Sequence, residues 1–214
     1  MEDGIKTLQR FGVLEECDQR NSKGRWPEPR SGHRMCADDN FLYVFGGYDA
    51  AKDNCLYQEL WRFNITTEKW SKLPDDENGA PKECLSSTML LWRRKIIVYG
   101  GTGYPFGEEK GNQIYMYCLK TFKWFNLSEV TPNKSSDEIS SCVRSECCCV
   151  DRIAPSPSPL ARYGHSMALS EANGDIYIHS GTEGTNTLDE LFKFNLMERT
   201  WNIFGPATSS KQVP

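Results

Sequence analysis

The chain has 214 residues and a formal net charge of −4, and 38% of its residues are hydrophobic, so it can bury a sizeable core. No block of positive charge stands out and no purely apolar run approaches the length that crosses a bilayer, which argues against a nucleic-acid partner and against a membrane span. The first residues lack the positive start and apolar core of a signal peptide. We therefore expect a protein of the cytoplasm or nucleus whose nine cysteines are reduced thiols.

The N-terminal segment, residues 1–28, is polar except for a short apolar island from Leu8 to Leu14. The end of this island, Phe11-Gly-Val-Leu14, has an aromatic-x-x-aliphatic form that returns later in the chain, for example at Trp70-Ser-Lys-Leu73. Two interpretations stay open. The island is an outer β-strand that closes a blade begun elsewhere, or the segment is a disordered tail.

Residues 29–127 contain two runs rich in β-branched and aromatic residues, which predict buried strands. The first run ends at Gly46-Gly47 and the second at Gly100-Gly101. Each glycine pair is followed by another apolar stretch and then by a tryptophan, Trp70 or Trp124, and an aromatic residue always stands seven positions before it. The constant spacing indicates an internal repeat.

Residues 128–158 lengthen the connection to the next unit. This stretch is rich in Ser, Pro and Glu and offers little to bury, so we predict a disordered surface insertion. It holds four of the cysteines, Cys142, Cys147, Cys148 and Cys149. Adjacent thiols do not easily close one zinc tetrahedron, which usually uses separated pairs, so we predict no metal site here.

Residues 159–206 show the same pattern a third time, with Ser180-Gly181 in place of a glycine pair and Phe194 seven residues before Trp201; residues 207–214 form a tail. A repeat of about 50 residues built from strand, glycine pair, strand and tryptophan is typical of kelch repeats, each of which forms one four-stranded propeller blade. The sequence therefore predicts an all-β fold, a partial kelch-type β-propeller of three full blades, with the N-terminal island as a possible outer strand.

No catalytic apparatus is visible in the sequence. His33 and His165 open the first and third repeats, and a histidine at this place is usually a hydrogen-bonding spacer between blades; a metal-binding or catalytic role is the alternative. Nothing resembles a HExxH or a Ser-His-Asp set. We therefore predict a chain that is not an enzyme and that holds no cofactor.

The loop Gly100-Gly-Thr-Gly-Tyr-Pro-Phe-Gly107, together with Arg30-Ser-Gly-His33 and Glu59-Leu-Trp-Arg62, resembles the kelch domain-containing protein 10 family. The resemblance implies a propeller that serves as substrate receptor of a cullin-2 ubiquitin ligase, recognises proteins by their C-terminal tails and docks to elongin B/C through a box after the blades. No such box is visible after residue 204. Two alternatives are a protein-binding scaffold outside any ligase and an enzyme of the kelch-type oxidase kind, which would need a copper site.

Capture of a C-terminal tail needs cations or backbone N–H groups around a carboxylate, beside an apolar wall. Arg30 and Arg162, on the loops that open two blades, are the candidate cations, and ordinary salt bridges between blades are the alternative for them. The candidates for further hydrogen bonds and for the apolar wall are Ser31, Tyr163, Tyr104 and Phe106. For the last two the alternative is simple packing over the next blade.

Overall fold

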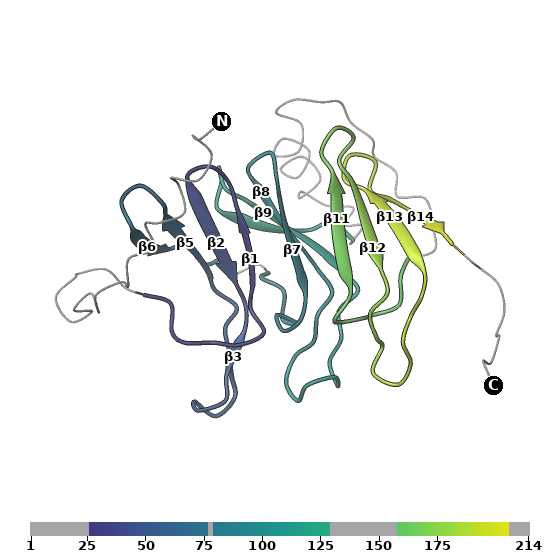
Figure 1. Cartoon of the computed structure of the whole chain (residues 1–214), viewed down its shortest axis with the longest axis horizontal. Helices are drawn as coiled ribbons and strands as arrows, with labels where there is room; N and C mark the ends of the chain where they lie inside the picture. The colour runs from purple at the N-terminus through teal and green to yellow at the C-terminus, as the bar shows by residue number, and fades with distance from the viewer. Residues whose placement is uncertain (1–25, 77–78, 129–157, 206–214) are drawn as a thin grey trace, which may run out of the picture.

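The computed structural model describes residues 26–76, 79–128 and 158–205, and these form three four-stranded antiparallel sheets side by side (Figure 1). The predicted all-β, partial propeller fold is confirmed. The apolar island at Phe11–Leu14 and the four cysteines of the insertion lie outside the described residues. Among the described residues no helix is long and apolar enough to cross a membrane.

Each sheet is one blade, and its strands follow one another in space in chain order. Blade 1 consists of β1 (Arg34–Ala37), β2 (Phe41–Phe45), β5 (Leu60–Asn64) and β6 (Lys69–Lys72). Blade 2 consists of β7 (Thr88–Trp92), β8 (Lys95–Tyr99), β9 (Ile114–Cys118) and β10 (Lys123–Asn126). Blade 3 consists of β11 (Ser166–Ser170), β12 (Asp175–His179), β13 (Leu191–Asn195) and β14 (Thr200–Phe204). A small hairpin, β3 (Tyr48–Asp49) and β4 (Cys55–Leu56), extends from the β2–β5 connection.

The seven-residue spacing between aromatic residue and tryptophan is a consequence of strand register. Each pair sits directly opposite across the two outer strands of its blade: Phe63 and Trp70, Tyr117 and Trp124, Phe194 and Trp201. Their ring centroids lie 5.1, 5.1 and 4.8 Å apart. Because directly opposed aromatic side chains stabilise a hairpin, the tryptophan fixes the register of the outer strand in every blade.

The core lies between blades, in two clusters of buried side chains. One joins blade 1 to blade 2, and Tyr43, Phe45 and Leu60 meet Met89, Val98 and Trp124 there. The other joins blade 2 to blade 3, and Ile97 and Met116 meet Ile178 and Phe194 there. Both faces of blade 2 are therefore buried, as the apolar residues on both faces of its strands predict.

The glycine pairs lie at the seams between blades. Gly47 donates its backbone N–H to the carbonyl of Cys84 in the next blade (3.2 Å), and Gly101 donates to that of Arg162 (2.9 Å). A Cβ on Gly46 would lie 2.3 Å from the Cys84 carbonyl oxygen, and one on Gly100 would lie 2.8 Å from that of Arg162. The first glycine of each pair thus lies very close to the backbone of the following blade.

The expectation of reduced thiols is only partly met. Cys36, Cys55 and Cys84 carry free thiols. Cys118, which is buried at the end of β9, is disulfide-bonded. The expectation is therefore wrong for Cys118.

Candidate functional site

Two kinds of loop meet at one end of the three blades, the lower edge in Figure 1. The segment that opens each blade pairs with the segment that follows its glycine pair, through the single bridges Ser31–Tyr48, Leu85–Thr102 and Tyr163–Thr182. We call this end the loop face; it comprises residues 28–33, 46–59, 83–87, 100–113, 160–165 and 180–190. All six site residues predicted from the sequence lie on it.

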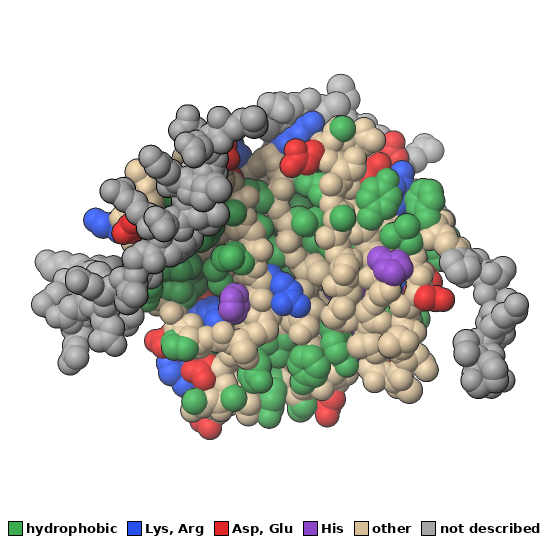
Figure 2. All heavy atoms as spheres, viewed as in Figure 1, with side chains coloured by type: hydrophobic (Ala, Val, Ile, Leu, Met, Phe, Trp, Pro, Cys, Tyr) green, Lys and Arg blue, Asp and Glu red, His purple; other side chains and the backbone are tan. Residues whose placement is uncertain are grey.

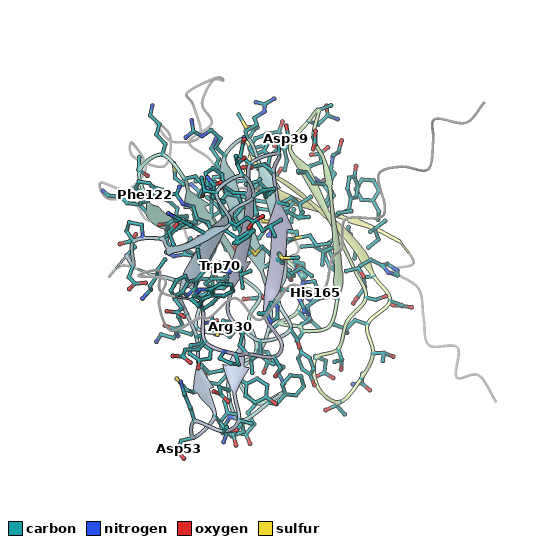
Figure 3. All side chains as sticks on the ribbon, turned by 60° about the vertical axis from the view of Figure 1, so that its left-hand side comes forward. Arg30, Asp39, Asp53, Trp70, Phe122 and His165 are labelled. Atoms are coloured by element: carbon teal, nitrogen blue, oxygen red, sulfur yellow. The ribbon has the colours of Figure 1, made fainter. Side chains whose placement is uncertain are left out.

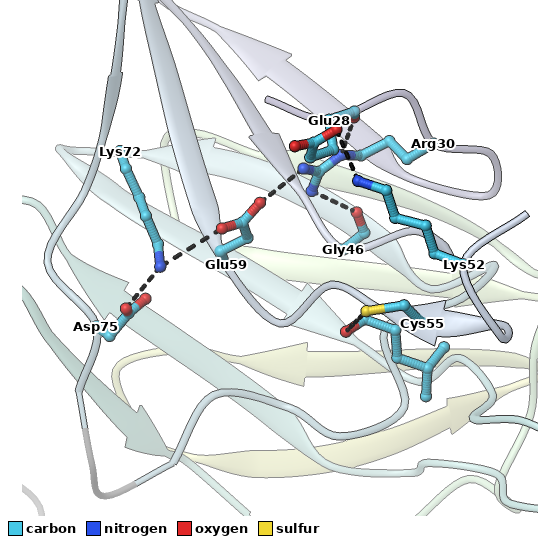
Figure 4. A network of polar contacts seen from close by, with 9 residues as sticks. Glu28, Arg30, Gly46, Lys52, Cys55, Glu59, Lys72 and Asp75 are labelled. Atoms are coloured by element: carbon cyan, nitrogen blue, oxygen red, sulfur yellow. Dashed lines mark hydrogen bonds and ion pairs between the residues drawn. The ribbon is translucent and has the colours of Figure 1, made fainter. Parts of the chain in front are cut away.

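Arg30 is engaged within its own blade. Its Nη2 donates to Glu59 Oε1 at 2.6 Å, its Nη1 donates to the carbonyl of Gly46, and its guanidinium lies 4.0 Å from the ring centre of Tyr57. Figure 4 shows this network continuing from Glu59 to Lys72. Only 4% of the Arg30 side chain is exposed, so its donors are directed at the protein and away from solvent.

Arg162 makes the equivalent contacts in blade 3. It donates from Nη1 to the carbonyl of Ser180 (3.0 Å) and from Nε to that of Leu160 (3.0 Å), and Nη1 lies 3.5 Å from the carboxylate of Glu190. The side chain is completely buried. The salt-bridge alternative therefore describes both arginines, with one difference: the pairs lie within a blade rather than between blades.

Blade 2 replaces both members of this pair. The bridge pattern aligns Cys84 with Arg30 and Arg162, and Gln113 stands directly before β9, where Glu59 and Glu190 stand before β5 and β13. Blade 2 thus lacks both the arginine and the glutamate. This is expected if the main role of each charge is to pair with the other, because a buried charge without its partner is costly. The two glutamates were missed by the sequence reasoning, although this paired replacement is visible in the repeat alignment.

The two loop aromatics are presented on a rigid loop. Thr102 Oγ1 donates to the carbonyl of Glu109 (2.6 Å) and accepts the N–H of Gly107 (2.9 Å), so the loop is closed by its own hydrogen bonds. Phe106 packs edge-on against Tyr163 of blade 3 at 5.0 Å between ring centroids, yet 57% of Phe106 remains exposed. Tyr104 is 46% exposed. The structure thus brings Phe106 of blade 2 and Tyr163 of blade 3 together. Phe106 packs over the next blade, as the alternative predicts, and is still largely exposed to solvent.

Ser31 is exposed and pairs with Tyr48 through its backbone, in blade 1. It takes no part in the contact between Phe106 and Tyr163, so the six predicted residues divide into two groups. Arg30 and Ser31 belong to the blade 1 end of the loop face. Tyr104, Phe106, Arg162 and Tyr163 belong to the seam between blades 2 and 3.

His165 is a spacer between blades, as its position in the repeat predicts. Its Nε2 lies 2.7 Å from Thr88 Oγ1 on the inner strand of blade 2, and its ring packs edge-on against Tyr99. Figure 3 shows it between the sheets. Burial, followed by the positive charges of Arg162 and Arg34, lowers the pKa of His165 to about 4. His33 and His179 are exposed, so the spacer prediction holds for His165 and is wrong for His33, which opens blade 1.

The lowered pKa of His165 predicts a loss of stability in acid. Below its ordinary pKa of 6.5 the unfolded chain takes up a proton at this residue, whereas the folded chain does so only near pH 4. Neutral His165 therefore contributes about 3 kcal/mol to the free energy of unfolding above pH 6.5. This contribution is lost as the pH falls from 6.5 to about 4. Urea unfolding at several pH values should show this slope. The His165→Gln variant should show a flatter one, and equal slopes would contradict the assignment.

The described residues contain no group of three or more His, Cys, Asp or Glu side chains that could hold a metal ion. A cavity of about 320 Å³ opens between blades 1 and 2, where Leu60 and Trp124 form part of an apolar lining and Glu59, Lys72 and Asp75 contribute charged groups. Those charges are already paired, because Lys72 contacts both carboxylates.

Comparison with known proteins identifies kelch repeats, in agreement with the four-stranded blades of the structure. The family described as "KLHDC2/KLHL20/DRC7 Kelch-repeats domain" matches residues 13–153. The chain is similar to Kelch domain-containing protein 10 of Homo sapiens, with 32% identity over 202 residues, covering 90% of this chain and 39% of that protein. It is also similar to the Drosophila melanogaster Kelch domain-containing protein 10 homolog, with 28% identity over 205 residues, covering 89% of this chain and 30% of that protein. The chain thus spans well under half the length of these relatives.

Proposed function

Because this chain belongs to the kelch-repeat family, whose domains are generally protein-interaction modules, we propose that its loop face binds segments of other proteins. More specifically, we propose that it is the substrate-recognition part of a cullin-2 type ubiquitin ligase receptor and that it takes C-terminal tails. The finer proposal is supported by the loop Gly100–Gly107 and by the similarity to Kelch domain-containing protein 10.

The observation that carries the proposal is the exposure of Phe106 on a loop that cannot easily collapse. Its ring rests on Tyr163, and the loop beneath it is closed through Thr102. Exposed aromatic side chains with a fixed position lose little entropy on binding, and such residues dominate protein interfaces. The loop face therefore offers a ready anchor for an apolar side chain of a partner.

The arginines have a positioning role in this proposal. Since Arg30 and Arg162 are buried in pairs with Glu59 and Glu190, they hold the loops in place and leave the carboxylate of a tail to other groups. Lys110 is a cation on the same surface. A Cβ placed on Gly184 of blade 3 would lie 3.3 Å from its ammonium, so Lys110 reaches from one blade to the next, beside the aromatic pair.

The experiment uses the purified 214-residue chain and a synthetic library of tail peptides, each made with a free C-terminal carboxylate and as an amide. We expect retention of free-carboxylate peptides to fall about tenfold or more in the Phe106→Ala variant. Phe122→Ala is the matched control, because Phe122 is also exposed but lies at the opposite end of blade 2 from the loop face (Figure 3). Tail binding would be contradicted if the Phe106→Ala and Phe122→Ala variants retained the peptides equally. It would also be contradicted if the free-carboxylate and amide forms of each peptide were retained equally.

The ligase partners require a separate measurement. Size-exclusion chromatography of the purified chain with purified elongin B/C and cullin-2 tests whether a complex forms. Co-elution would support the receptor role. Tail binding without co-elution would favour the alternative, a protein-binding scaffold that does not assemble with these partners through the 214 residues.

A further inference from the structure

The charge around Phe106 and Tyr163 is strongly one-sided. Glu108 and Glu109 directly follow the aromatic loop, and the neighbouring blade 3 loop contributes Glu183 and Asp189. Lys110 is the one cation in residues 102–110 and 182–190. Figure 2 shows green apolar side chains and red carboxylates together along the lower edge.

These four carboxylates differ from three other acids of the loop face, Glu28, Glu59 and Glu190. Glu28, Glu59 and Glu190 are each paired with a lysine or arginine. In the part of the chain that the structure describes, no ion pair joins Glu108, Glu109, Glu183 or Asp189 to a cation, and Glu108, Glu109 and Asp189 are exposed. The surface thus combines exposed aromatic rings with carboxylates that form no ion pair, of which Glu183 accepts hydrogen bonds from Asn186.

We propose that this surface receives a partner segment that carries an arginine or lysine next to an apolar side chain. The inference rests on the proposed function and names the chemistry of its ligand. The apolar side chain would pack on Phe106, and the cation would lie over the ring of Phe106 or Tyr163 within reach of Glu108 or Glu109. Attraction between a cation and a ring face, added to a charge-assisted hydrogen bond, favours such a group over a neutral or acidic one.

The test compares two fluorescein-labelled peptide amides, Gly-Gly-Phe-Arg-Phe-Arg-Gly-Gly and the same peptide with glutamate in place of arginine. Fluorescence anisotropy with the whole chain should show the arginine peptide binding at least about tenfold more tightly, with affinity that weakens as salt rises. Equal affinities for the two peptides would overturn the proposal.

A charge-neutral variant locates the effect. The double variant Glu108→Gln/Glu109→Gln should bind the arginine peptide about fivefold more weakly. The matched control, Asp39→Asn/Glu171→Gln, changes the net charge equally in exposed turns at the opposite end of blades 1 and 3 and should bind like the unaltered chain. An equal loss in both double variants would show attraction to overall charge alone and would overturn the site.

The outcome also separates this inference from the proposed function. If tail peptides bind in a manner that depends on Phe106 but is indifferent to Glu108 and Glu109, the preference for a basic segment is wrong and the binding face stands. If neither the tails nor the arginine peptide depend on Phe106, both proposals fail. Melting temperatures of all variants confirm that each is folded.

Discussion

Replacing Gly101 with valine is expected to lower the free energy of unfolding by more than about 4 kcal/mol, or to prevent folding. The φ angle of Gly101 is +107°, which residues with a side chain rarely adopt. A Cβ there would lie 2.3 Å from the carbonyl oxygen of Glu83 and 2.9 Å from that of Leu85. The Leu85 carbonyl cannot retreat freely, because Leu85 and Thr102 exchange two backbone hydrogen bonds at this point.

The control is Gly100→Ser, one residue earlier. Its φ of +62° is matched by the +61° of Ser180, which occupies the same place in blade 3. A Cβ at Gly100 would meet the His165 ring at 2.7 Å as well as the Arg162 carbonyl, so some loss is expected, about 1–3 kcal/mol. Urea denaturation of both variants measures the difference. Equal losses would show that the two glycines are required for the same reason, contrary to this interpretation.

Replacing Arg162 with methionine is expected to cost about 3–5 kcal/mol of stability. The substitution removes a fully buried cation and leaves the carbonyls of Ser180 and Leu160 without their donor and the carboxylate of Glu190 without its counter-charge. An unpaired, partly buried charge accounts for much of such a loss. The double variant Arg162→Met/Glu190→Gln should therefore recover part of the lost stability. Blade 2 has neither charge at the equivalent positions, Cys84 and Gln113.

An exposed pair provides the comparison for Arg162. Lys52 lies 2.9 Å from Glu28, with both side chains more than half exposed, and solvent screens such pairs. The Lys52→Met variant should change the melting temperature little. If it changed as much as in Arg162→Met, or if the double variant were no more stable than the single one, the buried pair could not be the reason for the loss.

The features of this protein that depend on local periodicity could be predicted from the sequence alone. Strand positions, the repeat and the all-β blade follow from apolar runs and glycine pairs. The register of the outer strands is also local, because Phe63 and Trp70 are joined by a short turn and must face each other whatever surrounds them. The position at the start of a blade predicted a spacer for both His33 and His165, but only His165 is buried against a preceding blade, whereas His33 is exposed.

The groups that meet across the blades could not be predicted in this way, because their contacts depend on how the sheets pack. Arg30 and Glu59 are 29 residues apart, and nothing in the local pattern shows that their chains run side by side. The pairing of Phe106 with Tyr163 and the contact of Gly100 with Arg162 likewise depend on how blade 3 is placed against blade 2. A residue type at a given spacing indicates what a side chain can do. The packing of neighbouring sheets decides whether it is buried in a pair, as Arg162 is, or left at the surface, as Phe106 is.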